Sequence, residues 1–260
     1  MYSFACDKRL FNKFPGRILY PKRDFDGSAA QKAYLIGFRL GDLYVTKVSN
    51  GPYCQTIQIT CRTTKFVQIR LFRRLFQEYG HLYECKPDKQ RAFGLTFYVN
   101  RSFDFLLPKQ DHVEAWIQEN PECAAAFAAG YIDAEGSFHL VKQKSGLSKA
   151  VFALASQDKN ILAWFHSWFM RQQILCATPK LAIPKGTLRQ FRLNKDYWIL
   201  QVHRKDALLG LAKLVGQLIC HQKRRDDLAR VLRNVKERNR NPNLKFASRQ
   251  HRLLIQKFRQ

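Results

Sequence analysis

The stretch AFAAGYIDAEG, from Ala126 to Gly136, decides how this chain folds. Its small residues Ala126, Gly130 and Ala134 recur at every fourth position, so they share one face of a helix. A helix face without side chains lets a second helix approach closely. Because a glycine inside a helix costs about 1 kcal/mol relative to alanine, we expect a packing partner on that face.

A second copy of the pattern supplies that partner. The stretch LIGFRLGDL, from Leu35 to Leu43, continues the spacing of Ala33 through Gly37 and Gly41. If the two helices pack about a pseudo-two-fold axis, their final acids, Asp42 and Glu135, meet at the same end. Two carboxylates at the negative ends of helices repel each other. A divalent cation relieves that repulsion, and hard oxygen ligands suit Mg²⁺.

Each stretch alone also fits an ordinary core helix, but two copies in one register, both ending on an acid, favour a shared site. Together they resemble the LAGLIDADG homing endonucleases, in the single-chain form with two motifs. AAGYIDAEG, from Ala128 to Gly136, is similar to the nine-residue signature. LIGFRLGDL departs from the signature at Arg39, Leu40 and Leu43. Leu43 stands where the family usually has glycine.

The resemblance extends over roughly residues 33 to 233 and implies a site. Asp42 and Glu135 take the positions of the catalytic, metal-binding acids, and Gly41 and Ala134 lie beside them as further metal ligands. Mg²⁺ is the implied cofactor, with Mn²⁺ able to substitute and Ca²⁺ supporting binding without cleavage. The family also implies a mobile intron or intein context, and we favour a free-standing or intron-encoded protein.

Composition points to a polyanionic partner. The chain has 260 residues, 46% of them hydrophobic, with a net charge of +25 and a pI near 10.1. No apolar run approaches the roughly 20 residues of a membrane span, so nucleic acid is favoured over a membrane. Seven cysteines without zinc-site spacing, and an N-terminus without an apolar core, indicate an intracellular protein with reduced thiols.

The pattern predicts an α+β fold of two pseudo-symmetric αββαββα subdomains. In the first half, strands flank Asn50-Gly51, a helix runs from about Thr64 to Tyr79, a second hairpin turns at Pro87-Asp88, and SFDFLL makes a short helix. In the second half, strands flank Ser145-Gly146, and a helix carries Ile161 and Phe165. Further strands are predicted over LCATPKLAIP, RQFRLN and YWILQVH, with helices over about 205–220 and 223–236.

We divide the chain into five segments. These are a basic N-terminal extension (1–32), the first subdomain (33–107), a linker (108–121), the second subdomain (122–236) and a basic C-terminal tail (237–260). The two antiparallel sheets, each covered by helices on one face, would form one DNA-binding saddle with the motif helices at its centre.

Strand alternation and the resemblance predict which residues contact DNA. On the strands these are Thr46, Val48, Asn50, Gln58, Thr60, Arg62, Ser137, His139, Val141 and Gln143. Lys86, Arg91, Arg189 and Arg192 are predicted to contact mainly phosphate. An ordinary exposed strand is the alternative, and the two valines weaken the polar-face reading.

Hydrolysis also needs a positioned water and a cation near the phosphate. Lys223 stands where the family often has a lysine, with Gln222 as the alternative, and Lys109 is its predicted first-half counterpart. For the polar residue at the end of the second strand, alternation leaves open Ser156 or Gln157 in the second half and Cys61 or Arg62 in the first.

These observations predict a monomeric, sequence-specific endonuclease that cuts both strands of a long, asymmetric double-stranded DNA target. The alternative is an intron RNA-splicing maturase, or an inactive nucleic-acid-binding protein, on the same scaffold. A transcription regulator ranks last, because it would need an added DNA-binding domain, and the segment after Arg233 looks too short and too irregular to form one.

Overall fold

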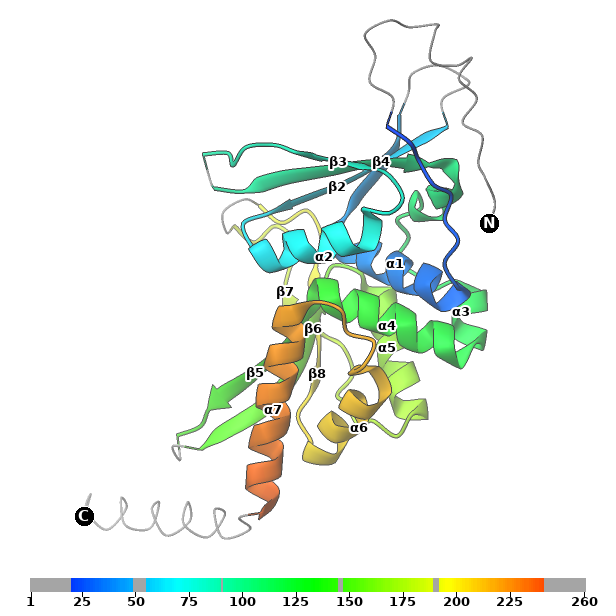
Figure 1. Ribbon diagram of the computed structural model, residues 1–260. Helices are drawn as coiled ribbons and strands as arrows, with labels where there is room; N and C mark the ends of the chain where they lie inside the picture. Colours follow the sequence, from blue (N-terminus) through cyan, green and yellow to red (C-terminus); the bar gives the residue numbers. More distant parts are fainter. Residues whose placement is uncertain (1–19, 49–54, 90, 145–146, 189–191, 241–260) are drawn as a thin grey trace, which may run out of the picture.

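The computed structural model describes residues 20–48, 55–89, 91–144, 147–188 and 192–240. It is an α+β fold with two four-stranded antiparallel sheets, ordered β1-β2-β4-β3 and β5-β6-β8-β7. The identical order in the two sheets confirms the predicted pseudo-symmetric halves. Figure 1 shows the sheets on opposite sides of a central pair of helices, α1 and α4.

The element bounds follow the predicted order. The first half contains α1 (Ala29–Asp42), β1 (Tyr44–Lys47), β2 (Thr56–Thr63), α2 (Phe66–Phe76), β3 (His81–Glu84), β4 (Phe93–Asn100) and the 3₁₀ helix η2 (Arg101–Leu106). The second contains α3 (Ala115–Glu119), α4 (Pro121–Glu135), β5 (Gly136–Lys142), β6 (Ser148–Ser156), α5 (Lys159–Arg171), β7 (Lys180–Ile183), β8 (Tyr197–Val202), α6 (Lys205–Val215) and α7 (Gln222–Arg240).

Both central helices begin at side-chain caps. Ser28 caps α1 through a reciprocal capping box with Gln31, so the helix begins at Ala29, inside the segment predicted as an extension. Asn120 caps α4 by accepting bonds from the backbone N–H groups of Glu122 and Cys123, at 2.9 and 3.1 Å. Caps therefore set where the two helices start.

The small-residue faces bring α1 and α4 into backbone contact. A Cβ added at Gly37 would lie 2.2 Å from the carbonyl oxygen of Phe127, and one added at Gly130 would lie 2.0 Å from that of Tyr34. Any side chain at either position would overlap the opposite backbone. The predicted close packing of the two motif helices is confirmed.

Each sheet buries one face in the core. In β2, Ile57, Ile59 and Cys61 are buried in the core, whereas Gln58 and Thr60 alternate with them. Leu95, Phe97 and Val99 of β4 and Leu200 and Val202 of β8 follow the same rule, whereas β6 is buried on both faces over residues 150–154. Helices cover the buried faces. The opposite face is accessible across β1 and β2 of the first sheet and along β5 of the second, where Ser137 and His139 are half-buried and Val141 is exposed.

Several segments differ from the sequence-based expectation. The strand predicted over LCATPKLAIP is shortened to β7, and the helix predicted to about residue 220 ends at Val215. The predicted linker contains the short helix α3, whose Ile117 is buried. Asp111, which precedes α3 in the linker, accepts hydrogen bonds from the backbone N–H groups of Asn160 and Ile161 at the start of α5. The strand predicted over RQFRLN is wrong where residues are described: Leu188 and Arg192 form an isolated bridge. Helix α7 runs past the predicted Lys236 to Arg240.

Among the described residues, no helix is both long and apolar enough to cross a membrane. The five described cysteines, Cys61, Cys85, Cys123, Cys176 and Cys220, are free thiols.

Candidate active site

The two predicted acids meet where α1 and α4 end together. Asp42 is the last residue of α1 and Glu135 the last of α4. A Cβ added at Gly41 would lie 2.5 Å from the Cβ of Ala134 and 3.1 Å from Oε1 of Glu135. The small residues Gly41 and Ala134 therefore let the two carboxylates approach, as their matching register predicts.

Glu135 is largely buried and lies near two other carboxylates. Burial, and then the charges of Asp42 and Asp158, raise the pKa of Glu135 to about 7, although Lys109 and Arg224 partly offset the rise. The described residues donate no hydrogen bond to its carboxylate. A group in this state gains by binding a proton or a cation.

The carboxylate of Asp42, unlike that of Glu135, accepts a hydrogen bond from a described side chain. Gln68 donates a hydrogen bond from Nε2 to Oδ2 of Asp42 at 2.7 Å. Burial raises the pKa of Asp42, while this hydrogen bond and the charges of Arg224 and Lys65 oppose the rise. Sequence reasoning missed Gln68, because its position in α2 reads as part of an amphipathic helix.

A cavity of about 410 Å³ opens beside Asp42. Four cationic side chains line it: Arg62, Lys65, Lys223 and Arg224. Its remaining walls come from Thr63, Thr64, Gln68, Ala92, Ala134 and His221. Positive groups around a small polar space suit an anionic group such as a phosphate oxygen.

Of the predicted cations, Lys109 lies close enough to Glu135 for its charge to lower the pKa of that carboxyl and of Asp158. Lys223 lines the cavity, but its ammonium pairs with Asp227, one turn along α7. The alternative, Gln222, donates to Asp226 at 2.8 Å. The structure thus brings Lys109 near Glu135 and directs Lys223 and Gln222 toward acids of their own helix.

Arg224 is the cation that sequence reasoning missed. Its charge acts on both Asp42 and Glu135, and its Nη2 lies 3.4 Å from the carbonyl oxygen of Ala134. Its Nε is buried and has no hydrogen-bond partner among the described residues. The run HQKRRDD shows three adjacent basic residues near the start of α7, but only the rotation of that helix decides which of them faces the acids.

The structure distinguishes the two candidates at the end of β2. Cys61 points into the core, where burial and then the charge of Asp42 raise the pKa of its thiol to about 12. Arg62 lies on the opposite face, lines the cavity and pairs with Asp88. Of the two candidates, Arg62 is therefore the one that faces the cavity.

In the second half, Ser156 ends β6 and Gln157 follows it. Ser156 is buried, and its hydroxyl donates to Oδ2 of Asp158 at 3.3 Å. Asp158, whose charge acts on Glu135, was not anticipated from the sequence. Ser156 is thus hydrogen-bonded to Asp158, and the charge of Asp158 acts on Glu135. A role for Gln157 stays a prediction.

The predicted DNA-contacting residues spread along the open faces. In β2, Nε2 of Gln58 donates a hydrogen bond to the hydroxyl of Thr60 at 3.3 Å. Thr46 lies opposite Gln58 on the neighbouring strand, β1. Ser137 and His139 of β5 are likewise 3.3 Å apart. Val141 is exposed and Gln143 lies in the turn that follows. Asn50 falls outside the described residues.

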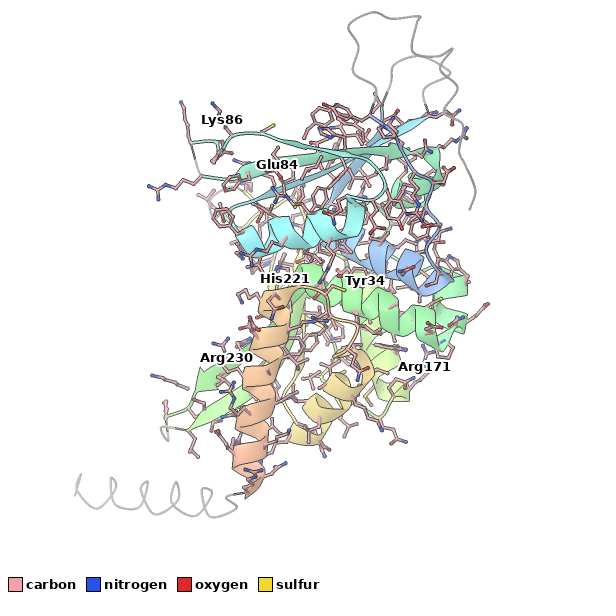
Figure 2. The ribbon with its side chains drawn as sticks, viewed as in Figure 1. Tyr34, Glu84, Lys86, Arg171, His221 and Arg230 are labelled. Carbon is pink, nitrogen blue, oxygen red and sulfur yellow. The ribbon has the colours of Figure 1, made fainter. Side chains whose placement is uncertain are left out.

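The predicted phosphate contacts are more scattered. Lys86 and Arg91 are exposed in the connection between β3 and β4, and Figure 2 shows Lys86 at its outer end, far from the central helices. Arg192 is exposed beside β7, and Arg189 falls outside the described residues. The three described residues do not line the cavity beside Asp42, and their contact with phosphate stays a prediction.

An aromatic set on the first open face was also missed. Tyr20, His81, Tyr83 and Tyr98 surround a hollow of about 910 Å³ that Val48 and Gln58 also line. The rings of Tyr20 and His81 stack with centroids 3.6 Å apart. Alternation within HLYE could have placed His81 and Tyr83 on this face, whereas the position of Tyr20 depends on a long-range contact.

Comparison with known proteins supports the architecture. No protein-family model and no curated protein matches the chain. The solved structure of the LAGLIDADG homing endonuclease I-GzeII, in complex with its DNA target, aligns with a TM-score of 0.50 at 11% identity, over 85% of this chain and 94% of that one.

Two further solved structures align at slightly lower scores. They are the homing endonuclease I-WcaI bound to its DNA recognition sequence (TM-score 0.49, 17% identity, 76% of this chain and 86% of that one) and I-DmoI in complex with DNA and Ca (0.48, 16%, 72% and 89%). With two like sheets joined through a pair of motif helices, the chain has the fold of the LAGLIDADG homing endonucleases.

Proposed function

We propose that this protein is a sequence-specific, Mg²⁺-dependent DNA endonuclease that cuts both strands of a long, asymmetric target and acts as a monomer. The observation that carries the proposal is the meeting of Asp42 and Glu135 at adjoining helix ends, beside a cationic cavity. The fold shared with I-GzeII and the net charge of +25 support a DNA partner.

The donor set fits a hard divalent cation. Burial and the charge of Asp42 raise the pKa of the Glu135 carboxyl. A cation between the two acids would remove the repulsion between their carboxylates. Among the described residues, no three His, Cys, Asp or Glu side chains gather into a closed metal site. Two carboxylates, with the backbone of Gly41 and Ala134 beside them, form an open site of the kind in which Mg²⁺ keeps several waters.

When bound, such a metal lowers the pKa of a coordinated water and neutralises charge on the phosphate. The chain's own cations would share the second task. Arg224 acts on both acids, Lys65 acts on Asp42, and Lys109 acts on Glu135. Fixed positive groups around the phosphate stabilise its developing charge without reorganisation during the reaction.

The open faces supply the proposed readout. Thr46, Gln58 and Thr60 present short hydroxyl and amide groups in the first half, and Ser137, His139 and Val141 present a different set in the second. Donors and acceptors along a strand ribbon can read base edges in the major groove. Because the two halves carry different residues, the proposed target is asymmetric.

The direct test is cleavage of a randomised duplex DNA library in Mg²⁺, with Ca²⁺ as the binding-only condition. We expect wild-type protein to enrich double-strand cuts at one long sequence, and Glu135→Gln and Asp42→Asn to bind that sequence without cutting it. Glu119→Gln changes an exposed carboxylate that precedes the start of α4, at the opposite end of that helix from Glu135, and serves as the matched control. Binding in Ca²⁺ without any Mg²⁺-dependent nick would refute the nuclease.

One observation favours a second candidate, an RNA-binding maturase. The aromatic set on the first open face resembles the stacking platforms on which proteins hold unpaired bases. Such rings have no stacking partner in a fully paired duplex. Tight binding of a structured intron RNA that is weakened by Tyr83→Ala, in a protein that leaves duplex DNA intact, would establish this candidate instead.

A further inference from the structure

The two acids differ in what holds their carboxylates. Oδ2 of Asp42 accepts a hydrogen bond from Gln68, while the described residues give Glu135 no such donor. Gln68 is the third residue of α2 and only 8% exposed, so its amide must find partners inside the protein. The third residue of α5, Ile161, is instead an apolar core residue.

His221 supplies the second partner of Gln68. Its Nε2 lies 3.1 Å from Oε1 of Gln68, and the imidazole is buried. Since the amide nitrogen donates to Asp42, the amide oxygen can only accept, so His221 must carry its proton on Nε2. The hydrogen bonds therefore run in one direction, from the imidazole through the amide to the carboxylate.

His221 is itself anchored at the helix interface. The backbone N–H groups of Cys220 and His221 donate to Oδ2 of Asp133 at 2.6 and 3.0 Å. Tyr34 of α1 donates its hydroxyl to the same oxygen at 2.7 Å. Figure 2 shows His221 at the start of α7, beneath α2. The start of α7 is thus fixed by residues of both motif helices.

We infer that Gln68 and His221 are positioning residues that orient the Asp42 carboxylate, so that the first acid depends on the docking of α7 from the second half. Fixing Oδ2 aims the other carboxylate oxygen away from Gln68. Because no described residue supports Glu135 in this way, loss of the Gln68–His221 pair affects the two strands of the DNA unequally. The inference rests on the proposed function, in which each acid serves the cutting of DNA.

The test is single-turnover cleavage of a target whose two strands carry different labels. We expect Gln68→Leu and His221→Phe to slow one strand by about 10- to 100-fold relative to the other, the usual effect of removing a group that supports a metal ligand. Nicked duplex then accumulates. His221→Gln keeps an amide N–H near the position of Nε2, so it should restore the balance between the strands.

Two controls separate positioning from a loss of stability. Ile69→Val removes one buried methyl group next to Gln68 and should lower the melting temperature without changing the strand ratio. The double variant Gln68→Leu/His221→Phe should be no slower than Gln68→Leu alone, because the two residues act as one unit. Equal slowing of both strands by Gln68→Leu, or an unequal effect of Ile69→Val, would overturn the inference. If Gln68→Leu does not fold, the comparison of His221→Gln with His221→Phe decides.

Mn²⁺ affinity, measured by electron paramagnetic resonance without DNA cleavage, distinguishes this inference from the proposed function. Gln68→Leu should bind Mn²⁺ about tenfold or more weakly than wild type. A wild-type protein that binds Mn²⁺ but cuts neither strand refutes the nuclease, while weaker binding by Gln68→Leu still supports the positioning role. Unchanged Mn²⁺ affinity overturns the positioning role, and wild-type protein that binds no Mn²⁺ overturns both.

Discussion

Glu135 shows at the scale of one residue what the meeting of two helices does to a carboxyl group. Burial and Asp42 raise its pKa from the ordinary 4.5 to about 7. Between these values the folded state binds more protons than the unfolded state, so the stability supplied by this group falls as pH rises. Without divalent cations, Glu135→Gln should melt at a higher temperature than wild type at pH 8, and the gain should shrink at pH 5.

Thermal melts in a chelator at the two pH values check this prediction, with Glu119→Gln as the exposed control. Adding Mg²⁺ at pH 8 should raise the melting temperature of wild type more than that of Glu135→Gln, because binding to the folded state stabilises it. A gain for Glu135→Gln that is the same at pH 5 and pH 8 would show that Glu135 is ionised normally.

Arg224 and Lys223 offer a second prediction at the residue scale. Arg224 acts on both acids, whereas Lys223 pairs with Asp227. Removing a group that stabilises developing charge typically slows a reaction by about 10²- to 10³-fold. We expect Arg224→Met to lose this much of the single-turnover cleavage rate in Mg²⁺ and Lys223→Met to lose far less. A larger loss for Lys223→Met would restore the assignment made from the family resemblance.

At the scale of elements, the α1–α4 interface depends on two glycines. Alanine at Gly37 or Gly130 would gain about 1 kcal/mol of helix propensity, but its Cβ would lie 2.2 or 2.0 Å from a carbonyl oxygen of the other helix. Steric overlap with a backbone outweighs the propensity, so we expect each variant to lose several kcal/mol of stability, beyond the usual range for a single substitution. Urea unfolding measures the loss.

Gly210 in α6 is the matched control for these helix glycines. A Cβ at this position would lie 3.4 Å from a side-chain carbon of Ile174, which is close to ordinary contact. Gly210→Ala should therefore be neutral or gain up to about 1 kcal/mol. If Gly37→Ala and Gly130→Ala behave like Gly210→Ala, the two motif helices do not touch through their backbones.

At the scale of the whole molecule, the two open sheets and the excess of positive charge predict how binding responds to salt. The logarithm of the DNA affinity should fall linearly with the logarithm of salt concentration, with a slope of about −0.9 per neutralised phosphate. Lys86→Ala, at the outer end of the β3–β4 connection, should weaken target and random DNA equally and make the slope shallower by about one. Gln58→Ala should instead reduce the preference for the target over random DNA.

Fluorescence anisotropy over a salt series separates these two effects. Equal slopes for wild type and Lys86→Ala would remove Lys86 from the DNA contact, and an unchanged preference in Gln58→Ala would remove base readout from β2. Gln58 lies in β2 and Lys86 in the β3–β4 connection of the same half of the molecule, so each variant serves as the control for the other.

The sequence by itself determined the repeated order of helices and strands, the packing of α1 on α4, and the meeting of Asp42 and Glu135. Each of these follows from a local period, of four residues on a helix face or two along a strand, that the tertiary structure has only to satisfy. Errors fell where no period exists, as at the helix within the predicted linker and at the strand predicted over RQFRLN.

Only the tertiary structure decided which neighbours complete the site. Arg224 rather than Lys223 acts on the acids, Arg62 rather than Cys61 faces the cavity, and His221 reaches Gln68 across 153 positions of the chain. These choices depend on how far each helix is rotated and on contacts between distant segments, which set the direction of a side chain but leave no periodic trace in the sequence.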